Sequence, residues 1–205
     1  HAPQIDWATY QPVVPNQTGV QVLSHIPLET IIPYIHWTFF FTAWKLNGRF
    51  AELTQLHDCE GCRSSWLAGF TGAERENAEE AIHLYQDAKE LLAQLVEQRV
   101  DYCRAVYGFF PAYSEADTIW MNQVALPVLR QQVKREDNTY KSLADYVMPQ
   151  SCGRADYVGA FAVTGGAGAE SLHASFEAEG DTYRAMLLQT LTDRLAEATA
   201  EYLHE

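Results

Sequence analysis

Basic residues are scarce in this sequence. The 205 residues include 14 lysines and arginines against 27 aspartates and glutamates, which gives a formal net charge of −13 at pH 7. Nucleic acids and anionic membrane surfaces attract proteins through clustered basic side chains. Because no basic stripe interrupts the acidic balance, we expect no nucleic acid and no membrane among the partners of this chain.

Long apolar runs and abundant cysteine are missing too. The most apolar stretch, residues 31–44, contains Pro33, His36 and Thr38 and is shorter than the run of about 20 apolar residues that a membrane-spanning helix needs. Four cysteines in a chain of this length do not form a disulfide framework, which favours a reducing, cytoplasmic location. No secretory signal is recognisable, and the start at His1 suggests a piece of a longer protein.

Signatures of several enzyme classes are absent as well. The sequence has no hydrolase nucleophile motif, no P-loop, no complete dinucleotide fingerprint and no internal repeat. Its composition of 47% apolar and 20% charged residues is typical of a globular protein with a hydrophobic core. Function therefore has to be sought in local patterns.

The stretch DYVGAFAVTGGAG, residues 156–168, organises the rest of the chain. Its apolar run predicts a buried strand, followed by a glycine-rich turn and a helix that begins at Ala169. Small residues in the strand indicate that other parts of the chain approach its backbone closely. A strand that leads through glycines into a helix is also a place where a ligand meets exposed N–H groups, so both interpretations stay open.

Helical and strand patterns are segregated along the chain. The proline-rich residues 1–30 predict an N-terminal arm or linker, residues 31–205 predict one domain, and residues 49–72 appear irregular. Strands are predicted at residues 104–110, 118–121 and 124–130, between long helices over about residues 74–99 and from Asp181 to the end. The predicted inner face of the first long helix consists of Ala78, Ile82, Tyr85, Lys89, Leu92 and Val96. This grouping favours an α+β fold with an antiparallel sheet flanked by long helices.

An H-x-C-x-x-C pattern is formed by His57, Cys59 and Cys62. Imidazole and thiolates at this spacing are ligands that zinc uses, but a fourth ligand would have to come from Cys103 or His36. A single C-x-x-C pair is equally compatible with a redox dithiol or with a variable loop. We therefore predict no metal site and keep zinc as an alternative.

Four carboxylates recur at helical spacing near the end of the chain, at positions 193, 197, 201 and 205. Like charges four residues apart repel one another on a helix surface, so this face is either simply solvated or meets cations. His36, by contrast, lies among aromatic residues, where a histidine packed against the backbone is the more frequent role.

Six stretches then occur in a recognisable order: PYIHWTFFFTAWKLNGRF, RAVYGFFPAYS, LRQQ, LADYVMP, DYVGAFAVTGGAG and DTYRAMLLQTLTDRLAEATAEYLHE. Together they resemble the activation (reactivation) domain of cobalamin-dependent methionine synthase, from about Pro33 to Glu205. The resemblance implies a single C-shaped α+β domain with a central antiparallel sheet. It also implies membership in a cytoplasmic methyltransferase that methylates homocysteine from methyltetrahydrofolate through methylcobalamin.

In that family the domain restores the enzyme after cob(I)alamin has been oxidised to cob(II)alamin. It binds S-adenosylmethionine over the cobalamin, which a separate cobalamin-binding module holds, while a flavodoxin-type partner supplies an electron; the isolated chain is expected to have no turnover. The resemblance implies that Glu197 lines the S-adenosylmethionine site. Asp193 is expected to face the cobalamin module and to receive the histidine released from cobalt, and His36 stands where the family has a ligand-contacting aspartate.

Several features depart from the family pattern. An imidazole at His36 cannot replace the attraction of a carboxylate for an ammonium group. The family continues after YLHE with an R-x-x-x-G-Y segment, so we expect a piece of a longer protein or a shortened relative that docks on a corrinoid protein without S-adenosylmethionine. The loop at about residues 56–72 is long and carries the cysteines. For an acidic flavodoxin the chain offers only local basic residues such as Arg130, Lys134 and Arg135.

Overall fold

The chain consists of a strand-rich unit and a helical unit. The computed structural model describes residues 5–98, 103–133, 139–166 and 168–205. The strand unit comprises His1–Val22 with Val106–Ala162, and the helical unit comprises Leu23–Ala105 with Val163–Glu205. All α-helices among the described residues belong to the helical unit, so each unit draws on two separate parts of the sequence.

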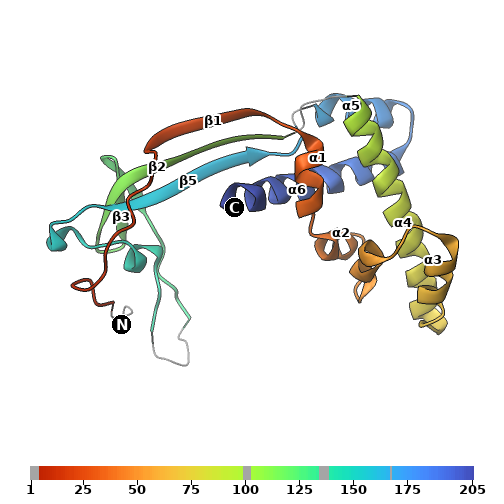
Figure 1. Cartoon of the computed structure of the whole chain (residues 1–205), viewed down its shortest axis with the longest axis horizontal. Coiled ribbons are helices and arrows are strands. Elements are labelled where there is room, and N and C mark those ends of the chain that lie inside the picture. Colours follow the sequence, from red (N-terminus) through yellow and green to blue (C-terminus); the bar gives the residue numbers. More distant parts are fainter. Residues whose placement is uncertain (1–4, 99–102, 134–138, 167) are drawn as a thin grey trace. The chain divides into compact units, whose positions relative to one another are not determined.

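Five strands form one sheet (Figure 1). They are β1 (Gly19–Ile26), β2 (Cys103–Glu115), β3 (Thr118–Met121), β4 (Val124–Pro127) and β5 (Asp156–Thr164). The order is β1-β2-β3-β4, and β5 also pairs with β2. The strand β1 lies within the predicted N-terminal arm, so part of that arm is a member of the sheet. The mixture of helices with an antiparallel sheet confirms the α+β prediction.

The strands predicted at residues 118–121 and 124–130 are antiparallel neighbours, β3 and β4, but β4 ends at Pro127 and not at Arg130. The strand β3 pairs with β2 from Ala112↔Met121 to Glu115↔Thr118 and with β4 from Met121↔Val124 to Thr118↔Pro127. The prediction that β2 ends before Pro111 is wrong, because the strand continues to Glu115. Pro111 precedes the ladder with β3, where its carbonyl oxygen accepts a hydrogen bond from the Asn122 N–H at 3.1 Å.

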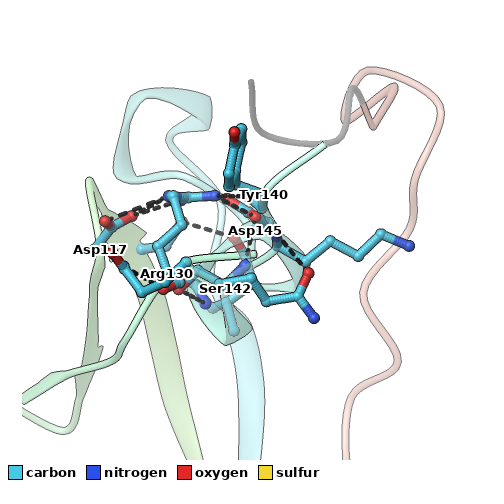
Figure 2. A network of polar contacts seen from close by, with 11 residues as sticks. Asp117, Arg130, Tyr140, Ser142 and Asp145 are labelled. Atoms are coloured by element: carbon cyan, nitrogen blue, oxygen red, sulfur yellow. Dashed lines mark hydrogen bonds and ion pairs between the residues drawn. The ribbon is translucent and has the colours of Figure 1, made fainter. Parts of the chain in front are cut away.

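A charged network fastens the loop after β4 in the strand unit (Figure 2). The Arg130 guanidinium lies 2.5 Å from Asp117 and 2.7 Å from Asp145, and it donates to the Tyr140 carbonyl oxygen at 2.6 Å. Asp145 also accepts from the Ser142 N–H in a capping box that begins the 3₁₀ turn η3 (Leu143–Tyr146). Hydrogen bonds from Arg130 hold the pKa of Asp145 below its usual value.

The helical unit contains six α-helices among its described residues. They are α1 (Leu28–Ile31), α2 (Trp37–Ala43), α3 (Glu60–Leu67), α4 (Gly72–Glu97), α5 (Ala169–Ala178) and α6 (Thr182–His204), and η1 (Ile32–Tyr34) and η2 (Phe50–Gln55) are 3₁₀ turns. A short 3₁₀ turn, η4 (Gln150–Cys152), belongs to the strand unit. None of the described helices is long and apolar enough to cross a membrane.

Two sequence-based predictions about the helical unit need correction. Residues 49–72 are not irregular, because they contain η2 and α3. The buried residues of α4 are Ala78, Ala81, Leu84, Ala88, Leu91, Leu92 and Leu95. The buried face is therefore rotated from the predicted one, because small alanines let neighbouring elements approach the helix closely, whereas Tyr85 and Lys89 lie at its margin.

The strand β5 and the glycine turn after it differ from the sequence-based picture in burial. Most of β5 is exposed, so the prediction of a buried strand is wrong. Its glycines nevertheless mark close contacts: a Cβ atom on Gly159 would lie 3.0 Å from the Phe109 ring, and one on Gly165 would lie 2.5 Å from the Ala196 nitrogen. The turn thus packs directly against the backbone of α6, which favours the close-packing interpretation of the glycines over a ligand cradle.

Candidate functional site

The last helix, α6, presents the predicted acidic residues to solvent. Asp181 caps its N-terminus, since the Asp181 carboxylate accepts a hydrogen bond from the Arg184 N–H at 3.0 Å. The buried face of the helix is formed by Ala185, Leu187, Leu188, Thr190, Leu191, Leu195, Ala198 and Thr199. Since this face points into the core, the opposite face leaves Asp193, Glu197 and Glu201 exposed.

This acidic ridge, Asp193, Glu197, Glu201 and Glu205, is partly neutralised. The Arg194 guanidinium lies 2.6 Å from the Glu197 carboxylate, and Glu205 accepts a hydrogen bond from a tyrosine hydroxyl at 2.6 Å. Asp193 and Glu201 have no ion pair or hydrogen bond from their carboxylates to other residues that the structure describes. These two carboxylates are therefore the ones available to a cation.

The ring of His36 is exposed at the start of α2. His36 directly precedes the first helical residue, Trp37, and its ring centroid lies 5.5 Å from that of Phe39. Within the described part of the chain the imidazole makes no hydrogen bond. His36 therefore does not have the more frequent role of a histidine that is hydrogen-bonded to the backbone.

A hollow of about 390 Å³ connects this histidine with the acidic ridge. Its walls are residues 33–38, three residues of η2 (Ala51, Thr54 and Gln55) and Glu201 of α6. Two contacts bring α6 to this place: Tyr34 packs edge-on against Tyr202, with centroids 5.7 Å apart, and the Tyr34 hydroxyl donates to Glu205. This hydrogen bond also raises the pKa of Tyr34.

The predicted residues are thus only partly brought together. His36 shares the hollow with Glu201, whereas Glu197 and Asp193 do not line it. At a rise of 1.5 Å per residue, Glu197 lies about 6 Å and Asp193 about 12 Å from Glu201, toward the N-terminus of α6. The four-residue spacing had pointed to Glu201, but the position that meets the hollow depends on how α6 packs on η1.

The pattern of His57, Cys59 and Cys62 forms a compact cluster in the helical unit. Their ligand atoms all lie within 4.8 Å of one another. A hydrogen bond from the Cys62 side chain, followed by one from His57, lowers the pKa of Cys59 to about 7. Neither Cys103, which is buried, nor His36 belongs to this cluster. The two residues that the sequence suggested as a fourth ligand therefore do not complete the site.

Comparison with known families agrees with the resemblance seen in the sequence. The model of the vitamin B12 dependent methionine synthase activation domain matches residues 27–205. The chain belongs to this family.

A solved structure of the same kind supports the assignment over the whole chain. The chain is similar to a crystal structure of the MetH reactivation domain bound to AdoHcy, with 34% identity and a TM-score of 0.82. The match covers 99% of this chain and 59% of that one, so this member of the activation-domain family spans about three-fifths of the solved chain. The matching fold confirms the predicted domain type.

One residue beside the acidic ridge was not anticipated. The Arg194 side chain is only 17% exposed, and its Nε is buried with no hydrogen-bond partner among the described residues. The half-buried Arg194 therefore pairs with the exposed Glu197 carboxylate. The sequence could have indicated this ion pair, because Arg194 stands three residues before Glu197 and residues at this spacing are neighbours on a helix.

Proposed function

We propose that this chain is the reactivation module of a cobalamin-dependent methionine synthase. In this role it binds S-adenosylmethionine and docks on the cobalamin module, so that the sulfonium methyl group reaches the cobalt during reductive methylation of cob(II)alamin. The observation that carries the proposal is the likeness over 99% of the chain to a reactivation domain bound to AdoHcy. Methyl transfer requires the cobalamin held by the other module, so the isolated chain turns over no substrate.

The hollow beside His36 suits one end of such a ligand. Small-molecule sites usually enclose about 300–1,000 Å³, and the hollow of about 390 Å³ lies in this range. S-adenosylmethionine carries a sulfonium and an ammonium group. Glu201 in the wall supplies a negative charge without a competing partner among the described residues, and Glu197, one turn away, adds a second when Arg194 releases it.

Asp193 has a different role in this proposal. It is exposed and its carboxylate is unpaired within the described part of the chain, and it lies about two turns of α6 from the hollow. This position suits contact with the docked cobalamin module, including acceptance of a hydrogen bond from the histidine that leaves cobalt.

A flavodoxin-type donor in the cytoplasm is the remaining partner of this proposal. Arg130 is not available to it as a free cation, since Asp117 and Asp145 already neutralise its charge. Lys134 and Arg135 lie outside the described residues. The docking of a flavodoxin is therefore proposed from the family role alone.

Calorimetric titration of the chain with S-adenosylmethionine and with S-adenosylhomocysteine tests the ligand site. We expect Glu201→Gln to weaken S-adenosylmethionine binding about five-fold, which corresponds to about 1 kcal/mol for an exposed charge pair. The matched control is Glu90→Gln on the exposed face of α4, which should leave the affinity unchanged. Equal affinities of the two variants would refute the role of Glu201.

His36→Asp tests the departure from the family pattern. A carboxylate at this position attracts the ligand's ammonium group, so we expect tighter S-adenosylmethionine binding than in the parent chain. Unchanged affinity would refute a role for position 36.

A second function, docking on a corrinoid protein without S-adenosylmethionine, is favoured by His36 itself. An imidazole at the rim of the hollow offers no negative charge to a cationic ligand. Binding of a purified cobalamin module together with no heat from S-adenosylmethionine would establish this alternative. Absence of both interactions would overturn the reactivation role.

A further inference from the structure

The connection between η2 and α3 brings three metal-binding side chains to one point. The imidazole nitrogen of His57 and the sulfur atoms of Cys59 and Cys62 lie within 4.8 Å of one another. His57 is exposed, while both cysteines are half-buried. The cluster does not overlap the hollow beside His36, which is lined by other residues.

Local backbone geometry explains why the two sulfurs meet. Cys59 is the N-cap of α3 with an extended backbone (φ −135°, ψ 154°), and its sulfur accepts a hydrogen bond from the Cys62 N–H at 3.3 Å. A residue at the N-cap and one three positions later lie on the same side of the first turn. The Cys59 N–H donates to the His57 carbonyl oxygen at 2.8 Å, which turns the chain so that His57 lies beside them.

An ion-pair clamp fixes this connection to the long helix. Asp58 lies 2.6 Å from the Lys89 ammonium on α4 and 2.5 Å from the Arg63 guanidinium on α3. Because Asp58 stands between the ligand residues in sequence, the clamp restrains the backbone on both sides of it. The cluster is therefore held against two helices and is not carried by a free loop.

The distances suit a single ion of zinc size. Zinc binds thiolate sulfur at about 2.3 Å and imidazole nitrogen at about 2.0–2.1 Å, and in a tetrahedral site the ligand atoms are then about 3.3–3.8 Å apart. Small side-chain rotations bring atoms within 4.8 Å to such separations. Two thiolates and one imidazole form a donor set that zinc uses with a fourth, open position.

We propose that His57, Cys59 and Cys62 bind one zinc ion, with water in the fourth position. Binding releases the two thiol protons to solvent and leaves two thiolates that balance the charge of the ion. This site goes beyond the reactivation role and against the expectation from the sequence, where no fourth protein ligand was evident. A disulfide between Cys59 and Cys62 would use the same sulfurs, but it would give the neighbouring imidazole no function.

Zinc titration of the reduced, metal-free 205-residue chain tests the proposal, with a chromophoric chelator as competitor. We expect one equivalent of zinc to bind, and cobalt(II) in its place to give thiolate-to-metal charge-transfer absorption and the visible bands of a tetrahedral site. Cys59→Ser and Cys62→Ser should abolish these bands, and His57→Ala should weaken zinc binding at least ten-fold.

Two controls separate the site from unspecific binding. Cys152→Ser removes a half-buried cysteine of the strand unit, and His83→Ala removes an exposed histidine of α4; both should bind zinc like the parent chain. The proposal is overturned if the parent chain binds no zinc, or if binding persists in the double variant of Cys59 and Cys62. It is also overturned if excess zinc does not slow formation of a Cys59–Cys62 disulfide.

Discussion

A methyl group added at Gly165 should disturb the helix that carries the acidic ridge. A Cβ atom at this position would lie 2.5 Å from the Ala196 nitrogen, 2.7 Å from the Thr192 carbonyl oxygen and 2.8 Å from the Leu195 carbonyl carbon. All three are backbone atoms of α6, so no side-chain rotation relieves the overlap. Ordinary van der Waals contacts of a Cβ atom are 3.4–4 Å. In Gly165→Ala the turn and α6 therefore have to separate by roughly an ångström.

The cost follows from the packing of α6. Forcing additional methyl groups into a well-packed site typically costs about 1–3 kcal/mol, and here the displaced group is a helix whose inner face is fully buried. For a chain of this size, 1 kcal/mol lowers Tm by about 2–4 °C. We therefore expect Gly165→Ala to lower Tm by about 2–12 °C, and to weaken S-adenosylmethionine binding because Glu197, the neighbour of Ala196, lies in the displaced turn.

Thermal unfolding followed by circular dichroism measures the first effect and calorimetry the second. The matched control is Gly166→Ala, whose Cβ would lie 3.4 Å from the side chains of Ala169 and Thr192, an ordinary contact. It should unfold within about 2 °C of the parent chain, or about 0.5 kcal/mol. If Gly165→Ala were as stable as this control, the inference that the turn abuts α6 would be refuted.

Three further predictions concern the strand unit and the cap of α6. Arg130→Ala should destabilise the chain by about 1–3 kcal/mol in urea unfolding, because it leaves the largely buried Asp145 carboxylate without its ionic partner; a loss below 0.5 kcal/mol would contradict this. The pKa of Asp145 is lowered in the folded chain, so its contribution to stability is present above the unfolded value of about 3.9 and is lost as the pH falls toward the folded value. Unfolding measured between pH 6 and about pH 3 should therefore depend less on pH in Asp145→Asn, and an unchanged slope would argue against the pairing. Asp181→Ala should cost about 0.5–2 kcal/mol while Asp181→Asn, an equally good cap, stays near the parent; equal losses in both would show that charge, and not capping, is what matters.

Local signals in the sequence were sufficient for many elements. Helix α5 begins at Ala169 and the last helix, α6, follows Asp181, both as predicted, because start and stop signals act within a few residues. Both strands of the β3–β4 pair were also predicted, although β4 ends at Pro127 and not at Arg130. The resemblance identified the family because long ordered stretches of the sequence carry it.

Long-range packing decided the rest. Helical periodicity predicted an acidic face on α6, but it could not tell that Glu201 is the member that shares a hollow with His36. That choice depends on the contacts of Tyr34 with Tyr202 and with Glu205, which lies 171 residues away. The cysteine pattern was visible too, whereas the closeness of its three ligands depends on the cap of α3 and the Asp58 clamp.

The glycine turn after β5 shows the same division. Its composition determined by itself that something must approach the backbone closely, because only residues without large side chains leave such space. Whether a ligand or a helix fills that space was decided by the tertiary structure, in which the backbone of α6 lies against Gly165. The sequence by itself determines that Gly165 has no side chain, and only the tertiary structure determines that the backbone of α6 occupies the space beside it.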